Sequence, residues 1–301
     1  MKKVITLVVI CVALVAKGQQ EPLHYTLNQF NSNLEFNPAY AGANESASLS
    51  LRGRKQWMGF DGAPTTFFFN AESRIKNDKL AGGLTIIKDK IGITNNLAAD
   101  LSLATHVKVS KTGTTSIGIK IGVNSINSDF SRLKNVDLSD PLYANPKVVI
   151  PYVGLGGLYY TKKLYLGLSV PRIMSIEDAS PQSKIIKPHV YLYGGYRIKL
   201  NEEIELRPAL LGKYVAAAPV VVDIALDAWY KGMVGIGVSY RTMDAVNYMI
   251  KARMQQCYFG YSYDMTTSKL RTYNSGTHEV YLGFEFGKKG NPDRNQNNRY
   301  F

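Results

Sequence analysis

The amino-acid sequence predicts an all-β protein, a transmembrane antiparallel β-barrel of about fourteen strands with short periplasmic turns and longer extracellular loops. Three observations lead to this prediction. Long stretches of the chain alternate apolar and polar residues, the connections between these stretches alternate between short and long, and the chain opens with a segment typical of exported proteins. After that opening no segment holds roughly eighteen consecutive apolar residues, which argues against a membrane-spanning helix.

The first residues have the layout of a secretory signal peptide. Two lysines precede an apolar run over residues 4–16, and Ala16 and Gly18 occupy the −3 and −1 positions of a cleavage site. We therefore expect residues 1–18 to be removed on export. The alternative is a buried N-terminal helix, but the order basic, apolar, small and polar is that of a signal.

Charge and cysteine content limit the partners and the chemistry. The formal net charge is +13, of which the signal peptide carries three lysines and no acid. In an exported protein this charge favours anionic lipid, lipopolysaccharide or an acidic protein surface over nucleic acid, although scattered basic residues also fit a solvated surface. Once the signal is removed Cys257 is the only cysteine, so no internal disulfide is expected.

The strand prediction rests on a period of two. Residues 97–108 and 115–124 place apolar and polar side chains alternately, and a strand turns successive side chains to opposite faces. Each such segment therefore has one apolar and one polar side. The pattern predicts strands near 45–56, 64–74, 79–88, 96–108, 114–124, 152–162, 163–170, 189–200, 203–214, 220–230, 233–241, 246–255, 256–265 and 277–287.

The connections between these strands fall into two classes. Short polar turns occupy even-to-odd joints, at 76–78, 110–113, 161–163, 201–202 and 231–232. The long connections, 125–151, 171–188 and 265–276, all occupy odd-to-even joints. Short turns on one side and long loops on the other are typical of an outer-membrane barrel, and an even strand number returns both termini to the periplasm.

The two faces of the strands have different expected surroundings. Lipid cannot hydrogen-bond a polar side chain, so the apolar faces are expected to contact lipid and the polar faces to line the lumen. The charged residues expected in the lumen are Asp100, Lys120, Arg197, Glu205, Arg207, Asp223, Asp227, Arg241, Arg253, Glu279 and Glu285. The rival fold is a soluble β-sandwich or lipocalin-like barrel, but one face of nearly every strand remains polar.

After the last predicted strand, residues 288–301 form a polar C-terminal tail.

No catalytic, cofactor or metal site is predicted. The chain has no GxSxG, P-loop or dinucleotide motif, and its four histidines lack ligand spacing. The glycines of Gly154–Gly157 fall within a strand, where they relieve curvature or admit a large neighbour. Asp223 and Asp227 share one strand face, which favours lumen lining over acid–base chemistry. We expect a protein that is not an enzyme.

The most distinctive stretch flanks the first strand. Residues 19–44 precede that strand, so they are expected in the periplasm or as a plug in the lumen. The candidate structural or interaction residues are Asn37, Pro38, Tyr40 and Gly42 before the strand, and Arg54, Gln56, Trp57, Gly59, Gly62 and Pro64 around the first outward loop. One interpretation is a clip, centred on Arg54 and Trp57, that pins the N-terminal segment to the barrel wall. Arg54 would bond backbone carbonyls and stack on an aromatic ring. The other interpretation is a partner site.

The same stretch resembles the opening signature of the PorP/SprF family of Bacteroidetes. The resemblance lies in Gln29-Phe30, residues 37–42, residues 54–65, residues 77–79, Gly82-Gly83 and residues 89–92. It implies an outer-membrane component of the type IX secretion system that supports export or surface attachment of a secreted protein, such as a gliding adhesin. Implied partners are the translocon, periplasmic ring or peptidoglycan-binding lipoprotein components, and the C-terminal domain of a large cargo. The alternative function is a passive porin or solute channel.

Overall fold

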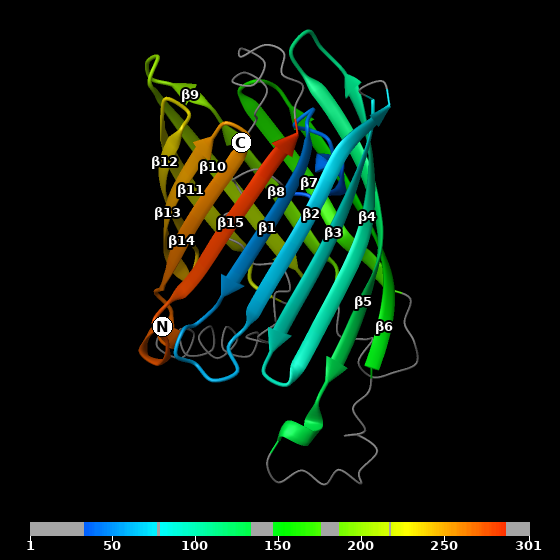
Figure 1. Ribbon diagram of the computed structural model, residues 1–301, viewed down its shortest axis with the longest axis vertical. Coiled ribbons are helices and arrows are strands. Elements are labelled where there is room, and N and C mark those ends of the chain that lie inside the picture. Colours follow the sequence, from blue (N-terminus) through cyan, green and yellow to red (C-terminus); the bar gives the residue numbers. More distant parts are fainter. Residues whose placement is uncertain (1–32, 77–78, 134–146, 176–186, 217, 287–301) are drawn as a thin grey trace, which may run out of the picture.

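The computed structural model describes residues 33–76, 79–133, 147–175, 187–216 and 218–286. Within these residues the chain forms one closed antiparallel β-barrel (Figure 1). The expected signal peptide (1–18), residues 19–32 and the polar tail (288–301) lie outside the described residues. No described helix is long and apolar enough to cross a membrane.

The barrel contains fourteen strands in an up-and-down order. Each strand pairs with its neighbours in sequence, and β1 pairs with β15 to close the sheet. The segments β8 and β9 are two parts of one strand, because both pair with β10. The strands are β1 (Ala47–Lys55), β2 (Thr65–Lys76), β3 (Leu80–Ile91), β4 (Thr94–Lys108), β5 (Thr114–Ser128), β6 (Lys147–Tyr160), β7 (Leu164–Ser175), β8 (His189–Tyr196), β9 (Ile198–Lys199), β10 (Ile204–Val215), β11 (Val221–Tyr230), β12 (Val234–Arg241), β13 (Ala245–Met254), β14 (Cys257–Thr266) and β15 (Thr277–Phe286).

The barrel prediction is confirmed, but three strands extend four or five residues beyond the predicted bounds. β5 continues to Ser128, β6 begins at Lys147 and β7 runs to Ser175. The sequence predicts a long loop that ends at Pro151 and another that begins at Pro171, whereas both prolines lie inside strands. Pro171 sits beside a register shift between β6 and β7, where the strand bulges and a missing amide hydrogen is tolerated.

The two faces of the wall separate as expected. Leu101 and Ile117 point outward and are 59% and 64% exposed, whereas Asp100 and Lys120, on the same strands, point inward and are buried. Their charges are paired, with Lys120 Nζ 3.0 Å from Asp100 Oδ1. The outer surface is therefore apolar, as contact with hydrocarbon requires, and the lumen is lined by paired charges.

The two ends of the barrel differ. The connections after β1, β5, β7 and β14 lie at one end, here called the long-loop end. The start of β1 and the end of β15 lie at the opposite end, here called the short-turn end, together with turns such as 161–163 and 231–233. In Figure 1 the short-turn end is at the top.

Candidate functional site: the occupied lumen and the first long loop

Residues 33–44 lie inside the barrel, where every one of them is buried. Figure 1 shows this segment, in blue, within the half of the barrel near the short-turn end. The segment is compact because it turns repeatedly. Asn37 N–H bonds to Asn33 O at 2.8 Å, a short 3₁₀ helix, η2, spans Pro38–Tyr40, and the Asn37 side chain accepts from the amide of Ala39 at 2.9 Å. We call residues 33–44 the lumen segment.

The barrel wall supplies donors for the backbone carbonyls of the lumen segment. Lys120 Nζ donates to Leu34 O at 3.2 Å and to Glu35 O at 2.9 Å. His106 Nε2 lies 2.8 Å from Ala41 O, and since a carbonyl can only accept, this nitrogen carries the hydrogen. Buried carbonyls without partners would destabilise the segment, so these inward side chains are what allow irregular backbone to fill the lumen.

The turn at Gly42 is held from both sides by β2. Its amide donates to Glu72 Oε2 at 3.0 Å, and its carbonyl accepts from Arg74 Nε at 2.9 Å. Gly42 has a φ of 68°, a left-handed conformation in which glycine is unstrained. Burial raises the pKa of the nearby Tyr40 phenol well above its ordinary value, and the Glu72 carboxylate adds to this, so the phenol stays protonated.

Wall glycines make room for the lumen segment. A side-chain carbon at Gly156 would overlap the Asn37 amide oxygen, and one at Gly118 would overlap the backbone at Ala39. The Asn37 amide nitrogen donates to Gly157 O at 3.1 Å and to the Tyr193 hydroxyl at 2.9 Å. The glycine run on β6 is thus explained by the close approach of a neighbour, one of the two roles expected for it.

An ion pair joins the lumen segment to the first strand. Arg52 Nη1 lies 2.7 Å from Glu35 Oε1, and Asn70 donates to the other Glu35 oxygen at 3.1 Å. The Arg52 Nε is 3.7 Å from Glu279 Oε1, and the other oxygen of this carboxylate, Oε2, lies 2.8 Å from Arg54 Nη1. These groups are almost fully buried, so each charge depends on its partner.

The charge network continues along the inner wall toward the long-loop end. Arg54 also binds Asp264 at 2.8 Å, and Arg241 lies 3.6 Å from the same carboxylate. Arg241 pairs with Asp223 at 2.8 Å, and Lys213 pairs with that carboxylate at 3.1 Å. Ion pairs between inward side chains therefore link strands that are far apart in sequence. Asp223 forms ion pairs in this network, as expected for a residue that lines the lumen.

The first long loop, residues 56–64, forms a compact turn. Gln56 N–H bonds to Pro64 O at 3.0 Å, and the Trp57 ring packs edge-on against Phe60 with ring centroids 6.4 Å apart. Gly59 and Gly62 adopt positive φ, as does Trp57 at 44°. These glycines allow the tight turns, which explains their place in the loop.

This loop is braced against two other loops. Met58 N–H donates to Gly276 O and Ser275 N–H donates back to Met58 O, each at 2.8 Å. The amide of Gly92, in the β3–β4 turn, donates to Gly62 O at 2.8 Å. The Trp57 amide donates to the Thr277 hydroxyl at 3.2 Å. The long-loop rim is thus held by backbone bonds between segments far apart in sequence.

The structure divides the candidate residues into two groups. Asn37, Pro38, Tyr40 and Gly42 lie in the lumen segment, whereas Arg54, Gln56, Trp57, Gly59, Gly62 and Pro64 lie at the long-loop end. The contact between β1 and the lumen segment differs from the predicted clip, which was centred on Arg54 and Trp57. Arg54 binds the carboxylates of Glu279 and Asp264, and Arg52, on the same strand, binds Glu35 of the lumen segment. The physical reason is depth, because Arg52 lies one pleat nearer the short-turn end.

Several wall residues that hold the lumen segment were not singled out from the sequence. They are Arg52, Asn70, Glu72, Arg74, His106 and Tyr193. Their one sequence signal is a polar side chain on the inward face of a strand, which nearly every strand shares. That signal does not say which of them meet an internal segment.

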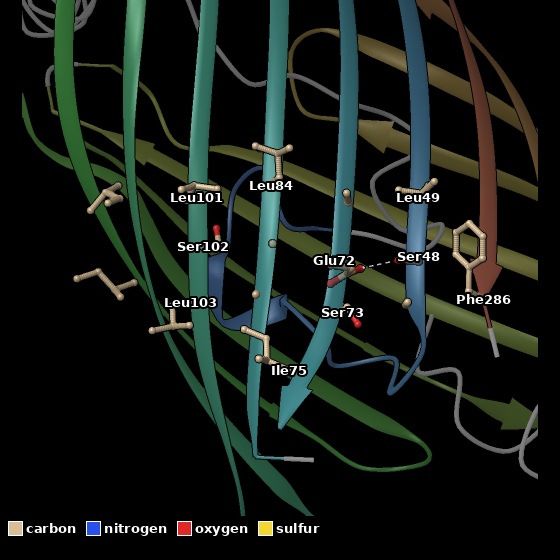
Figure 2. Close-up of a pocket in the computed structure, with 16 residues that line it drawn as sticks. Ser48, Leu49, Glu72, Ser73, Ile75, Leu84, Leu101, Ser102, Leu103 and Phe286 are labelled. Atoms are coloured by element: carbon tan, nitrogen blue, oxygen red, sulfur yellow. Dashed lines mark hydrogen bonds between the residues drawn. The ribbon is translucent and has the colours of Figure 1, made fainter. Parts of the chain in front are cut away.

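A shallow cavity of about 710 Å³ lies on the wall formed by β1 to β5 and the end of β15 (Figure 2). Its sides are mainly outward apolar residues such as Leu49, Leu101 and Phe286, and small residues such as Gly82 line it as well. On the inner side of this wall Leu34 packs on Gly83, where an added side-chain carbon would lie 2.7 Å from the leucine. The cavity is therefore part of the lipid-facing surface, backed by the lumen segment.

A family model matches the part of the sequence that includes the lumen segment, the first long loop and nearly the whole barrel. It is described as type IX secretion system membrane protein PorP/SprF, and it matches residues 17–284. The chain belongs to the PorP/SprF family. This PorP/SprF protein is accordingly an outer-membrane component of the type IX secretion system.

Solved structures with a similar fold are outer-membrane barrels. The CymD monoaromatic hydrocarbon channel has a TM-score of 0.53 at 10% identity, covering 91% of this chain and 96% of that one. A Pseudomonas aeruginosa FadL homologue has a TM-score of 0.49 at 11% identity, covering 90% and 100%. Acinetobacter baumannii Omp33 has a TM-score of 0.48 at 8% identity, covering 81% and 100%. The likeness to CymD supports the barrel fold of the PorP/SprF protein and nothing further. No curated protein matches the sequence significantly.

Proposed function

We propose that this PorP/SprF protein is a closed outer-membrane partner that engages one secreted cargo of the type IX system. The long-loop end would face the cell surface and both termini the periplasm, since outer-membrane barrels keep their short turns on the periplasmic side. An N-terminal signal peptide would deliver the chain to the periplasm. This role needs no catalysis, cofactor or metal.

The occupied lumen carries this proposal. Residues 33–44 are buried within the barrel and held by Arg52, Lys120 and His106 through hydrogen bonds of 2.7–3.2 Å. A passive channel needs a continuous water path, which a fixed internal segment obstructs. A barrel whose own chain fills its lumen is better suited to bind partner proteins than to conduct solutes.

The braced rim supports docking at the long-loop end. Because the loop at 56–64 is bonded to the loop before β15 and to the β3–β4 turn, a partner would meet a preorganised surface. Preorganisation reduces the entropy lost on binding. We propose the C-terminal domain of a large exported protein, such as a gliding adhesin, as the cargo element. Translocon, ring or peptidoglycan-binding lipoprotein components would engage the short-turn end.

A comparison of surface and medium proteins between the parent strain and a deletion strain tests this function by mass spectrometry. Loss of one large surface protein, restored by the wild-type gene, is the expected result. Loss of many exported proteins would instead make the protein a general part of the secretion machine. An unchanged set of exported proteins would contradict a role in secretion.

The second candidate function is a solute channel. It is favoured by the charged residues of both signs that line the lumen toward the long-loop end, such as Arg241 and Asp264. Conductance in planar bilayers separates the two functions. Steady open channels from the wild-type protein would favour the solute channel, and silent bilayers the closed partner.

A further inference from the structure

We propose that the long-loop rim of β1 and β3 carries a binding site for the phosphate groups of an outer-leaflet phosphoglycolipid, built from Lys55, Lys88 and Lys90. The inference rests on the proposed orientation, in which the long-loop end faces outward. It concerns the outer face of the wall, away from the lumen and from the braced loops.

Strand register places two of these lysines in one outward row. Lys55 pairs with Thr65, and Thr65 pairs with Lys90, so the two lysines lie at the same height on either side of β2. Two strand spacings separate their backbones by about 10 Å, which two flexible lysine side chains can bridge around one anion. Lys55 Nζ also donates to the Thr65 hydroxyl at 2.9 Å, which orients its ammonium group along the rim.

The row continues on both sides as a polar belt. His278 of β15 pairs with Lys55 and faces outward, and in the other direction the row passes through asparagines to Lys147 of β6. The next row toward the membrane centre is mainly apolar and contains Val280, Gly53, Phe67, Lys88, Leu97, Ser125 and Val149. The lysine row therefore marks the boundary at which hydrocarbon gives way to head groups.

Lys88 belongs to this apolar row, yet it is exposed. Its long aliphatic stem can lie along the wall while the ammonium reaches the head-group level. It lies two residues from Lys90, about 7 Å along the strand, so the two are close enough to share a ligand. Three cations therefore converge on one short arc of the rim.

The described outward positions of β1, β2 and β3 hold no aspartate or glutamate. Asp89 lies between Lys88 and Lys90 in sequence but points inward, where the Thr66 hydroxyl donates to it at 2.6 Å. Among the described residues, neither Lys88 nor Lys90 forms an ion pair. Uncompensated lysines beside a membrane attract anionic head groups, and phosphate is an acceptor that lysine binds well.

The rest of the rim has a different character. On the arc from β10 to β14 the described strands have no outward lysine or arginine toward the long-loop end, and their exposed side chains there include Tyr214, Tyr240, Tyr248 and Tyr261. Tyrosines anchor a barrel at the interface without selecting a charge. On the described strands the outward lysines toward the long-loop end therefore lie on the arc from β1 to β6, although the loops carry other exposed cations such as Lys269 and Arg271.

Binding of purified full-length protein to diphosphoryl lipid A in detergent, measured by native mass spectrometry and calorimetry, tests the site. The probes for comparison are the same lipid without its phosphates, phosphatidylglycerol and inorganic phosphate. The variant is Lys55→Gln/Lys88→Gln/Lys90→Gln. The matched control is Lys108→Gln/Lys162→Gln/Lys163→Gln, which removes three exposed lysines at the short-turn end. Heat-modifiable migration in gels verifies that each barrel is folded.

We expect the rim variant to lose at least tenfold in affinity for diphosphoryl lipid A, since one lysine near a membrane surface contributes about fivefold. The control variant should stay within about twofold of wild type. Unchanged binding by the rim variant, equal loss in the control, or equal binding of the dephosphorylated lipid would overturn the site. Equal binding of phosphatidylglycerol would overturn the assignment to the outer-leaflet lipid. Because these measurements use no secretion readout, they stand apart from the outcome of the deletion experiment.

Discussion

Arg52 donates to Glu35 across 2.7 Å, and this buried ion pair connects the first barrel strand to the segment that fills the lumen. Both side chains are at most 2% exposed, and Arg52 also lies 3.7 Å from Glu279. The Arg52 guanidinium therefore compensates the charge of Glu35 in the lumen segment. It also contributes to compensating the charge of Glu279 in the wall.

Removal of this guanidinium is expected to destabilise the barrel strongly. Arg52→Leu leaves the buried Glu35 carboxylate without this cation, and breaking one side of a buried pair costs about 3–5 kcal/mol. Urea unfolding in lipid vesicles measures the loss. Lys231→Gln, at the exposed Lys231–Glu203 pair, should cost about 1 kcal/mol or less. Similar losses in the two variants would mean that the Arg52–Glu35 pair does not hold the lumen segment.

Displacement of the lumen segment is expected to open the barrel. A side-chain carbon at Gly156 would overlap the Asn37 amide, whereas one at Gly157 meets no atom within 4 Å. Gly156→Val should therefore expel or loosen residues 33–44 and give conductance in planar bilayers. Gly157→Val, one residue away, should remain silent like the wild type. If both variants are silent although folded, the lumen segment is not what closes the barrel.

Trp57→Ala is expected to impair export while leaving the barrel intact. The ring packs on Phe60 within the same loop, and the bond from residue 57 to the wall uses its backbone amide. Barrel abundance, measured by immunoblot of outer membranes, should stay within about twofold, because most surface substitutions cost less than about 0.5 kcal/mol. Cargo at the surface should fall. Met58→Ala is the matched control in the same turn. A parallel fall in abundance would make Trp57 a structural clip instead.

Cysteine labelling tests the proposed orientation. In a Cys257→Ser background, Met58→Cys should react with a membrane-impermeant maleimide on intact cells, since Met58 is exposed at the long-loop end. Lys162→Cys, exposed in a turn at the short-turn end, should react only after the cells are lysed. The opposite pattern would reverse the orientation and place the proposed lipid site in the inner leaflet.

Much of the fold was predictable from residue patterns. Alternation over 97–108 and 115–124 anticipated β4 and β5, because a strand with lipid on one side and polar surroundings on the other must alternate. The misjudged ends have a local cause. Pro151 and Pro171 are common loop markers, and only the bulge between β6 and β7 showed that a strand accommodates Pro171.

The sequence by itself determined the strand periodicity, the lopsided connections, the inward position of the charges and the family signature. Only the tertiary structure decided that residues 33–44 occupy the lumen, that Arg52 rather than Arg54 binds them, and that Lys55 and Lys90 share one row. The physical reason is that side-chain direction follows from local alternation, whereas closure, register and depth in the barrel are properties of the whole sheet. Residues from the two ends of the chain, such as Arg54 of β1 and Asp264 of β14, are brought together only when the sheet closes.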